Sequence, residues 1–195
     1  MADETRFEGL RKLSGRTAGE LISGSRMPFQ TVIESPRDSD VATVLAEFER
    51  KGADQDMLAL FALALPPREA AWWACLAGRD LYPADDTDRS PTLDAAEAWV
   101  FRPTDENRAA VKTALERARP DDEGIECANA ALYAPGTLGP GDLEKYDAPK
   151  DVREIQVFAM MVKSCAAAQD PEARRRLLVE RALDIARGGN GRVDP

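Results

Sequence analysis

Prolines separate the apolar segments of this chain, and they constrain its fold more than any other feature. Pro66-Pro67, Pro91, Pro103 and Pro171 each lie between one periodic stretch and the next. Proline disfavours helix in the residue before it, yet it fits a first helical turn, where its missing N–H removes no hydrogen bond. The sequence therefore predicts a series of helices joined by sharp corners.

Apolar residues between these corners recur with helical spacing. Val41, Val44, Leu45 and Phe48 follow the i, i+3, i+4, i+7 pattern of an amphipathic helix. The segment 54–64 is apolar nearly all round, which predicts a central buried helix. The expected fold is all-α: a compact bundle of about seven to nine helices, with a solenoid-like succession of helical hairpins as a variant.

Three stretches divide the chain in this interpretation. Residues 1–36 form an N-terminal segment that the sequence predicts poorly, 37–188 a helical domain and 189–195 a flexible tail. Gln30 to Glu34 resembles a strand but has no partner strand. Residues 134–149, rich in glycine and proline, are predicted to be a loop. In the helix that follows, an inward stripe is expected from Ile155, Phe158, Val162 and Cys165, widened by Met161.

Composition argues against several classes of function. The net charge of -9 disfavours nucleic acid and anionic membrane surfaces as partners, and the absence of histidine removes Ser-His-Asp and Cys-His catalysis. Cys75, Cys127 and Cys165 are far apart, which argues against a zinc site. Because residues 1–13 are polar and acidic and the apolar run 57–65 is short, we expect neither a signal peptide nor a membrane span. We expect a cytoplasmic protein without membrane insertion, metal, cofactor or catalytic residue.

The acidic loop 83–97 has some features of a calcium site. Its oxygen-bearing residues have the spacing of an EF-hand loop: Asp86, Asp88, Ser90, Thr92, Asp94 and Glu97. However, Pro91 occupies the position where such a loop needs a glycine with positive φ, and proline is locked at negative φ. The stronger prediction is a loop that caps a helix beginning at Ser90-Pro91.

The segment LPPREAAWWACLAGR, residues 65–79, contains the candidate interaction or structural motif: Arg68, Glu69, Trp72 and Trp73. Adjacent residues on a helix point about 100° apart, so one tryptophan is expected in the core and the other at a rim. Arg68 and Glu69 each precede an indole by four residues and can lie against it. Packing is the favoured role, and the exposed members are candidate partner contacts.

Together with AAEAWVFRPTDENRAA and the closing LVERALDIARGG, this segment resembles an uncharacterised bacterial family with an LPPREAxWWA motif. The resemblance covers roughly residues 40 to 190. Members of that family occur near type VI secretion or contractile-injection genes, which implies a cytoplasmic accessory protein. The chain departs from the family's pattern at 123–149, which puts the identity of its partner in doubt.

The leading hypothesis is a non-enzymatic interaction protein, an adaptor or chaperone accessory to such a secretion system. Its partner would be a secretion component, a cargo protein or a toxin, and a homodimer is a further alternative. An immunity or antitoxin protein that binds one basic toxin remains open. So does an effector or enzyme that uses Asp, Glu and Arg chemistry, which would require those side chains to converge in a buried cleft.

Overall fold

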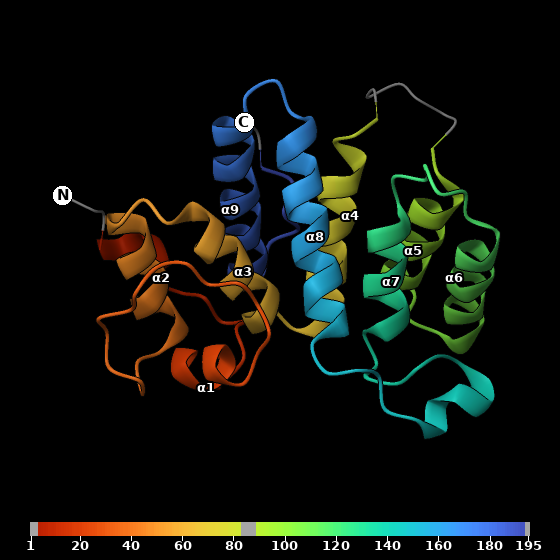
Figure 1. The fold of residues 1–195 in the computed structure, drawn as a ribbon, viewed down its shortest axis with the longest axis horizontal. Helices are drawn as coiled ribbons and strands as arrows, with labels where there is room; N and C mark the ends of the chain where they lie inside the picture. Colours follow the sequence, from red (N-terminus) through yellow and green to blue (C-terminus); the bar gives the residue numbers. More distant parts are fainter. Residues whose placement is uncertain (1–3, 83–88, 194–195) are drawn as a thin grey trace. The chain divides into compact units, whose positions relative to one another are not determined.

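The computed structural model describes residues 4–82 and 89–193, and this part of the chain folds into helices and connecting loops (Figure 1). No strand forms within it beyond a single bridge between Thr137 and Asp147. The helices are α1 (Ala18–Ser23), α2 (Val41–Arg50), α3 (Asp54–Ala64), α4 (Pro67–Arg79), α5 (Pro91–Phe101), α6 (Asp105–Arg117), α7 (Ile125–Tyr133), α8 (Val152–Ala167) and α9 (Pro171–Arg187), with short 3-10 helices η1 (Glu4–Phe7) and η2 (Gly141–Lys145). The all-α prediction is confirmed.

The chain forms two compact units. One combines Met1–Pro66 with Asp170–Pro195, and the other comprises Pro67–Gln169. The domain limits expected from the sequence stay a prediction, since compact packing does not establish which part folds independently. After α9, the backbone N–H of Gly191 donates to Asp184 at 2.8 Å.

Helix α3 forms the centre of the first unit, as its sequence predicts. It packs against α1, α2 and α9, and every residue from 56 to 64 is buried. Backbone hydrogen bonds attach the preceding segment to helix ends: the N–H of Lys12 donates to Ala186 and that of Ser14 donates to Ala64. The last helix of the chain therefore shares a core with residues at its beginning.

The strand-like segment 30–34 is held by side chains instead of by a partner strand. The N–H groups of Gln30 and Thr31 donate to the Asp56 carboxylate at 3.1 and 2.7 Å. Those of Glu34 and Ser35 donate to Glu47 at 2.7 and 2.9 Å. The two carboxylates, on α3 and α2, are buried, so they satisfy amide groups that a β-ladder would otherwise satisfy.

In the second unit, α7 contacts α4, α5, α6 and α8 (Figure 1). Gly78 permits the close approach of α4 to α7, since a Cβ there would lie 2.8 Å from the Sγ atom of Cys127 and 3.3 Å from a methyl carbon of Leu93. The alanine ridge of α4 is fully buried (Ala70, Ala74 and Ala77). Small residues thus let α4 pack closely against its neighbours.

The predicted stripe on α8 is wrong in part. Phe158, Met161 and Cys165 are buried as predicted, but Val162 is 44% exposed, and Met160, which the prediction omitted, is fully buried. The reason is that α8 packs against both α4 and α7, which widens and rotates its buried face relative to a simple i, i+3, i+4 stripe.

The two tryptophans of α4 should differ in their contribution to stability. Trp73 is completely buried, whereas Trp72 is half-buried at the rim, as the helical geometry predicts. We expect Trp73→Ala to lower the free energy of unfolding by about 3–5 kcal/mol. Trp72→Ala should lower it by about 1–2 kcal/mol, since one aromatic and one cation–π contact are lost. Urea unfolding followed by circular dichroism would measure both, and equal losses would contradict this assignment.

Glu47 should make the first unit acid-sensitive. Burial alone would raise the pKa of its carboxyl, but hydrogen bonds from Lys51, Ser35 and the amides of Glu34 and Ser35 outweigh burial and lower the pKa from 4.5 to about 2. A carboxyl whose pKa is lower in the folded chain than in the unfolded chain stabilises the fold at pH values above the unfolded pKa of 4.5. This contribution is lost as the pH falls from 4.5 toward about 2. In urea titrations across this window, Glu47→Gln should flatten the pH dependence of the unfolding free energy. The control variant Glu116→Gln, at an exposed residue, should show the same slope of unfolding free energy against pH as the wild type.

Candidate functional site

Helices α4 and α5 together present an aromatic surface. The ring centroids of Trp72 and Phe101 lie 5.3 Å apart at an interplanar angle of 59°, and Phe101 is 61% exposed. Three charged side chains are connected to this pair. Arg79 lies over the indole, Glu97 binds Arg79, and Arg68 donates to the backbone at Val100 and Phe101. We call these five residues the Trp72–Phe101 surface. An exposed phenylalanine beside a half-exposed tryptophan is typical of a binding surface.

A buried carboxylate holds a cation over the indole. The guanidinium carbon of Arg79 lies 5.1 Å from the centroid of Trp72. Arg79 donates from Nε to one oxygen of Glu97 and from Nη2 to the other at 2.7 Å, and only 8% of the Glu97 side chain is exposed. The hydrogen bond to Glu97 also raises the pKa of Arg79. Because this pair is bidentate and largely desolvated, it fixes the guanidinium geometry and thereby one edge of the indole.

Arg68 fixes the other end of the surface. Its Nε donates to the Val100 carbonyl at 2.6 Å and its Nη2 contacts the Phe101 carbonyl at 3.4 Å. These carbonyls lie in the last turn of α5, where acceptors lack helical partners. Arg68 therefore caps α5 and positions Phe101. The sequence predicted a contact of Arg68 with Trp72, four residues later, but not this contact with α5.

The structure separates the four residues of the sequence motif. Arg68 and Trp72 belong to the surface, Trp73 lies in the core, and Glu69 is half-buried in the first turn of α4. Sequence reasoning did not identify Arg79 as a member. The available signal was its spacing of seven residues from Trp72, which places both on one face of α4.

Metal ligands and cysteines are two kinds of group that could support chemistry in this unit. The described residues contain no group of three or more His, Cys, Asp or Glu side chains placed to hold a metal ion. Cys75, Cys127 and Cys165 are free and buried. The hydrogen bond to Cys127 and burial both raise the pKa of Cys75 well above its usual range, which disfavours the reactive thiolate.

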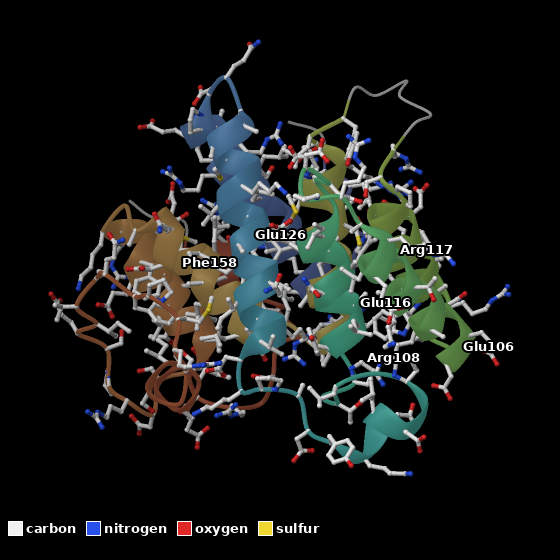
Figure 2. The ribbon with its side chains drawn as sticks, turned by 45° about the vertical axis from the view of Figure 1, so that its right-hand side comes forward. Glu106, Arg108, Glu116, Arg117, Glu126 and Phe158 are labelled. Carbon is white, nitrogen blue, oxygen red and sulfur yellow. The ribbon has the colours of Figure 1, made fainter. Side chains whose placement is uncertain are left out.

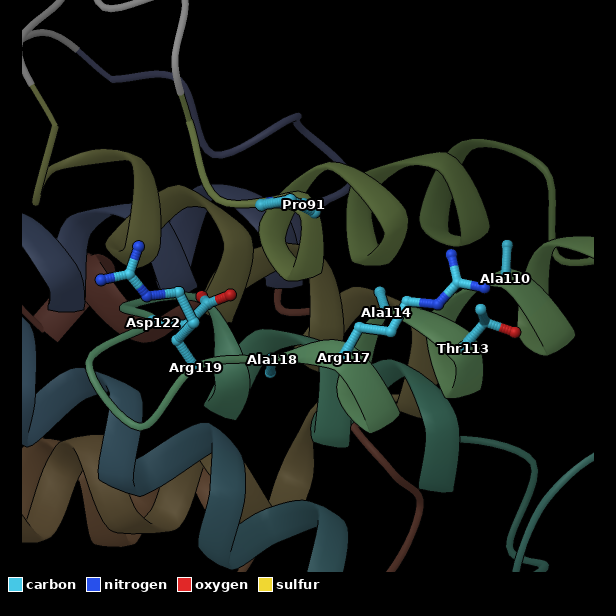
Figure 3. A pocket seen from close by; sticks show the side chains of 8 residues that line it. All are labelled: Pro91, Ala110, Thr113, Ala114, Arg117, Ala118, Arg119 and Asp122. Carbon is cyan, nitrogen blue, oxygen red and sulfur yellow. The ribbon is translucent and has the colours of Figure 1, made fainter.

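A groove of about 630 Å³ lies on the same unit, between the start of α5 and the end of α6 (Figure 3). Figure 3 shows the guanidinium groups of Arg117 and Arg119 on opposite sides of it. Asp122 lies at its edge and accepts from the hydroxyls of Ser90 and Thr92 and from the amide of Gly124 at 2.9 Å. Burial raises the pKa of Asp122, but these hydrogen bonds outweigh it and lower the pKa overall, so this carboxylate tethers the start of α7 to α5.

The described part of the acidic loop serves helix α5. Ser90 is its N-cap and accepts from the amides of Thr92 and Leu93, with Pro91 in the first turn, which confirms the predicted cap. Glu97 pairs with Arg79. Of the residues considered as calcium ligands, Asp86 and Asp88 lie outside the described residues.

The predicted loop 134–149 contains the short helix η2 and is attached to the unit by a buried arginine. Arg108, 2% exposed, donates to the carbonyls of Leu132 and Thr137, both at 2.9 Å, and to the Thr137 hydroxyl at 2.8 Å. Figure 2 shows Arg108 at the end of α6 nearest this loop. Burial lowers the pKa of Arg108, with Glu144 and Asp105 opposing that shift. No sequence signal distinguished Arg108 from the exposed arginines.

Replacing Arg108 should loosen the loop that it holds. Arg108→Met keeps most of the side-chain volume but leaves the carbonyls of Leu132 and Thr137 without this donor, which should cost about 2–4 kcal/mol. We also expect faster trypsin cleavage after Lys145, which is exposed in η2. Limited proteolysis with mass spectrometry would measure this. An unchanged cleavage rate at Lys145 would contradict the tethering role.

None of the described helices combines the length and hydrophobicity that a membrane span requires. No curated protein and no solved structure shows significant similarity to this chain. A family model does match it over residues 44–186, a range that contains α4, α5 and the whole Trp72–Phe101 surface. The matching family is described as one of unknown function, which agrees with the resemblance of the sequence to an uncharacterised family. The chain therefore belongs to DUF6931, a family of unknown function.

Proposed function

We propose that this chain is a non-enzymatic cytoplasmic adaptor or chaperone that binds a protein partner through the Trp72–Phe101 surface, as an accessory to a type VI secretion or contractile-injection system. The observation that carries the proposal is the exposed Phe101, whose ring lies tilted against Trp72, with Arg79 held over the indole by Glu97. The secretion context rests on the resemblance of the LPPREAxWWA segment alone.

The geometry favours binding for two physical reasons. Tryptophan and arginine contribute strongly to protein interfaces, because they combine large apolar area with a polar or charged group. Here Glu97 fixes Arg79 and Arg68 fixes the end of α5, so a partner would order few side chains on association. Preorganisation of this kind reduces the entropic cost of binding.

An affinity pull-down of the tagged chain from its native host tests the proposal. We expect a stoichiometric secretion component or cargo protein to co-elute with the wild type. Phe101→Ala should reduce its recovery about tenfold or more, which corresponds to an interface residue worth more than about 1.4 kcal/mol. The matched control is Val162→Ala, which removes an exposed apolar side chain on α8 and should leave recovery unchanged.

Other outcomes would contradict the proposal. Equal recovery of the partner by the wild type and by Phe101→Ala would show that the partner does not bind through the Trp72–Phe101 surface. A single basic toxin would favour the immunity alternative. The absence of any partner would favour an effector or enzyme, and ligand screening would follow.

A further inference from the structure

We infer that the partner segment recognised by the Trp72–Phe101 surface is acidic, with an apolar side chain that packs on Phe101 and carboxylates on either side of it. The inference rests on the proposed function, because it specifies the partner of that same surface. It is carried by the charges around Phe101, which are opposite in sign to those of the chain as a whole.

Two exposed arginines flank the exposed phenylalanine. Arg102 follows Phe101 directly at the end of α5, and Arg68 reaches the Phe101 carbonyl from α4. Within residues 4–82 and 89–193, neither arginine forms an ion pair with a carboxylate; the acceptors of Arg68 are neutral carbonyl oxygens. Both guanidinium groups therefore carry charge that no described acidic side chain neutralises at contact distance.

Three carboxylates of the neighbourhood are already engaged. Glu97 binds Arg79, and Asp94 lies 3.1 Å from Arg89. In the first turn of α6, hydrogen bonds from its own backbone amide and from the Thr104 hydroxyl lower the pKa of Glu106. The Trp72–Phe101 surface with Arg102 thus contains three guanidinium groups and one carboxylate, Glu97.

This local excess of positive charge selects the partner at contact. The net charge of -9 attracts basic molecules at long range, but salt screens that field beyond about 8–10 Å at physiological ionic strength. A basic segment on Phe101 would place its cations against Arg68 and Arg102, and like charges at an interface oppose binding. An acidic segment would form charge-assisted hydrogen bonds with both guanidinium groups.

Selection from a random peptide library displayed on phage tests the inference without knowledge of the natural partner. The immobilised full chain would be panned in parallel with its Phe101→Ala variant, and peptides that depend on Phe101 would be sequenced. We expect them to be net acidic and to carry an aromatic or leucine anchor. Peptides that depend on Phe101 but are net neutral or basic would overturn the inference and leave the proposed function standing. No Phe101-dependent enrichment would overturn both.

Fluorescence anisotropy with the most enriched labelled peptide would then identify the charges responsible. The double variant Arg68→Glu/Arg102→Glu should weaken binding at least about tenfold, since two attractive contacts become repulsive. The single variant Arg102→Glu separates this effect from the loss of the α5 cap, because the donor to the carbonyls of Val100 and Phe101 is Arg68. This single variant should weaken binding on its own.

Arg117→Glu is the matched control and should change the affinity less than about twofold. Arg117 is an exposed arginine at the opposite end of α6 from the junction with α5 (Figure 2). Unchanged or tighter binding by Arg102→Glu would overturn the inference.

Discussion

The close packing of α4 is the constraint on which the second unit depends. Gly78 and Cys127 approach so closely that a Cβ on Gly78 would collide with the Cys127 sulfur at 2.8 Å, and Trp73 is completely enclosed on the same helix. Because this face of α4 is fixed in the core, the positions of the side chains on its remaining face are fixed too. Trp72 and Arg79 must lie beside α5, where Glu97 completes the arrangement. The binding surface is therefore a consequence of how one helix is packed.

Charged side chains that are buried or half-buried hold irregular backbone in both units. Glu47 and Asp56 receive the amides of residues 30–35, and Arg108 donates to the carbonyls of Leu132 and Thr137. Asp122 connects α5 to the start of α7. In each case a group that is costly to bury is stabilised because it satisfies polar atoms that no helix or sheet satisfies.

The sequence predicts local structure well where one residue type determines it. The helix over 54–64, the corner at Pro66-Pro67 and the cap at Ser90 follow from apolar periodicity, proline geometry and hydroxyl capping. It predicts poorly whatever depends on distant partners. The segment 30–34 owes its shape to carboxylates more than ten residues away. Val162 is exposed because α8 turns other residues toward its two neighbours, α4 and α7.

The candidate site follows the same division. The orientation of Trp72 and Trp73 on different faces is a property of any helix, and it could be predicted from two adjacent residues. The pairing of Arg79 with Glu97 joins two helices and depends on their register. Nothing in the spacing of 79 and 97 specifies that register, so the pairing that holds Arg79 over the indole emerges only from the tertiary structure.

A double-mutant cycle between Trp72→Leu and Glu97→Gln tests the central claim most directly, namely that Glu97 fixes the aromatic surface through Arg79. The free energies of unfolding of the wild type, the two single variants and the double variant would be measured in urea. If Arg79 links the carboxylate to the indole, the combined loss should be smaller than the sum of the single losses by about 0.5–1.5 kcal/mol. Strictly additive losses would show that the carboxylate and the indole act independently, and would contradict the account.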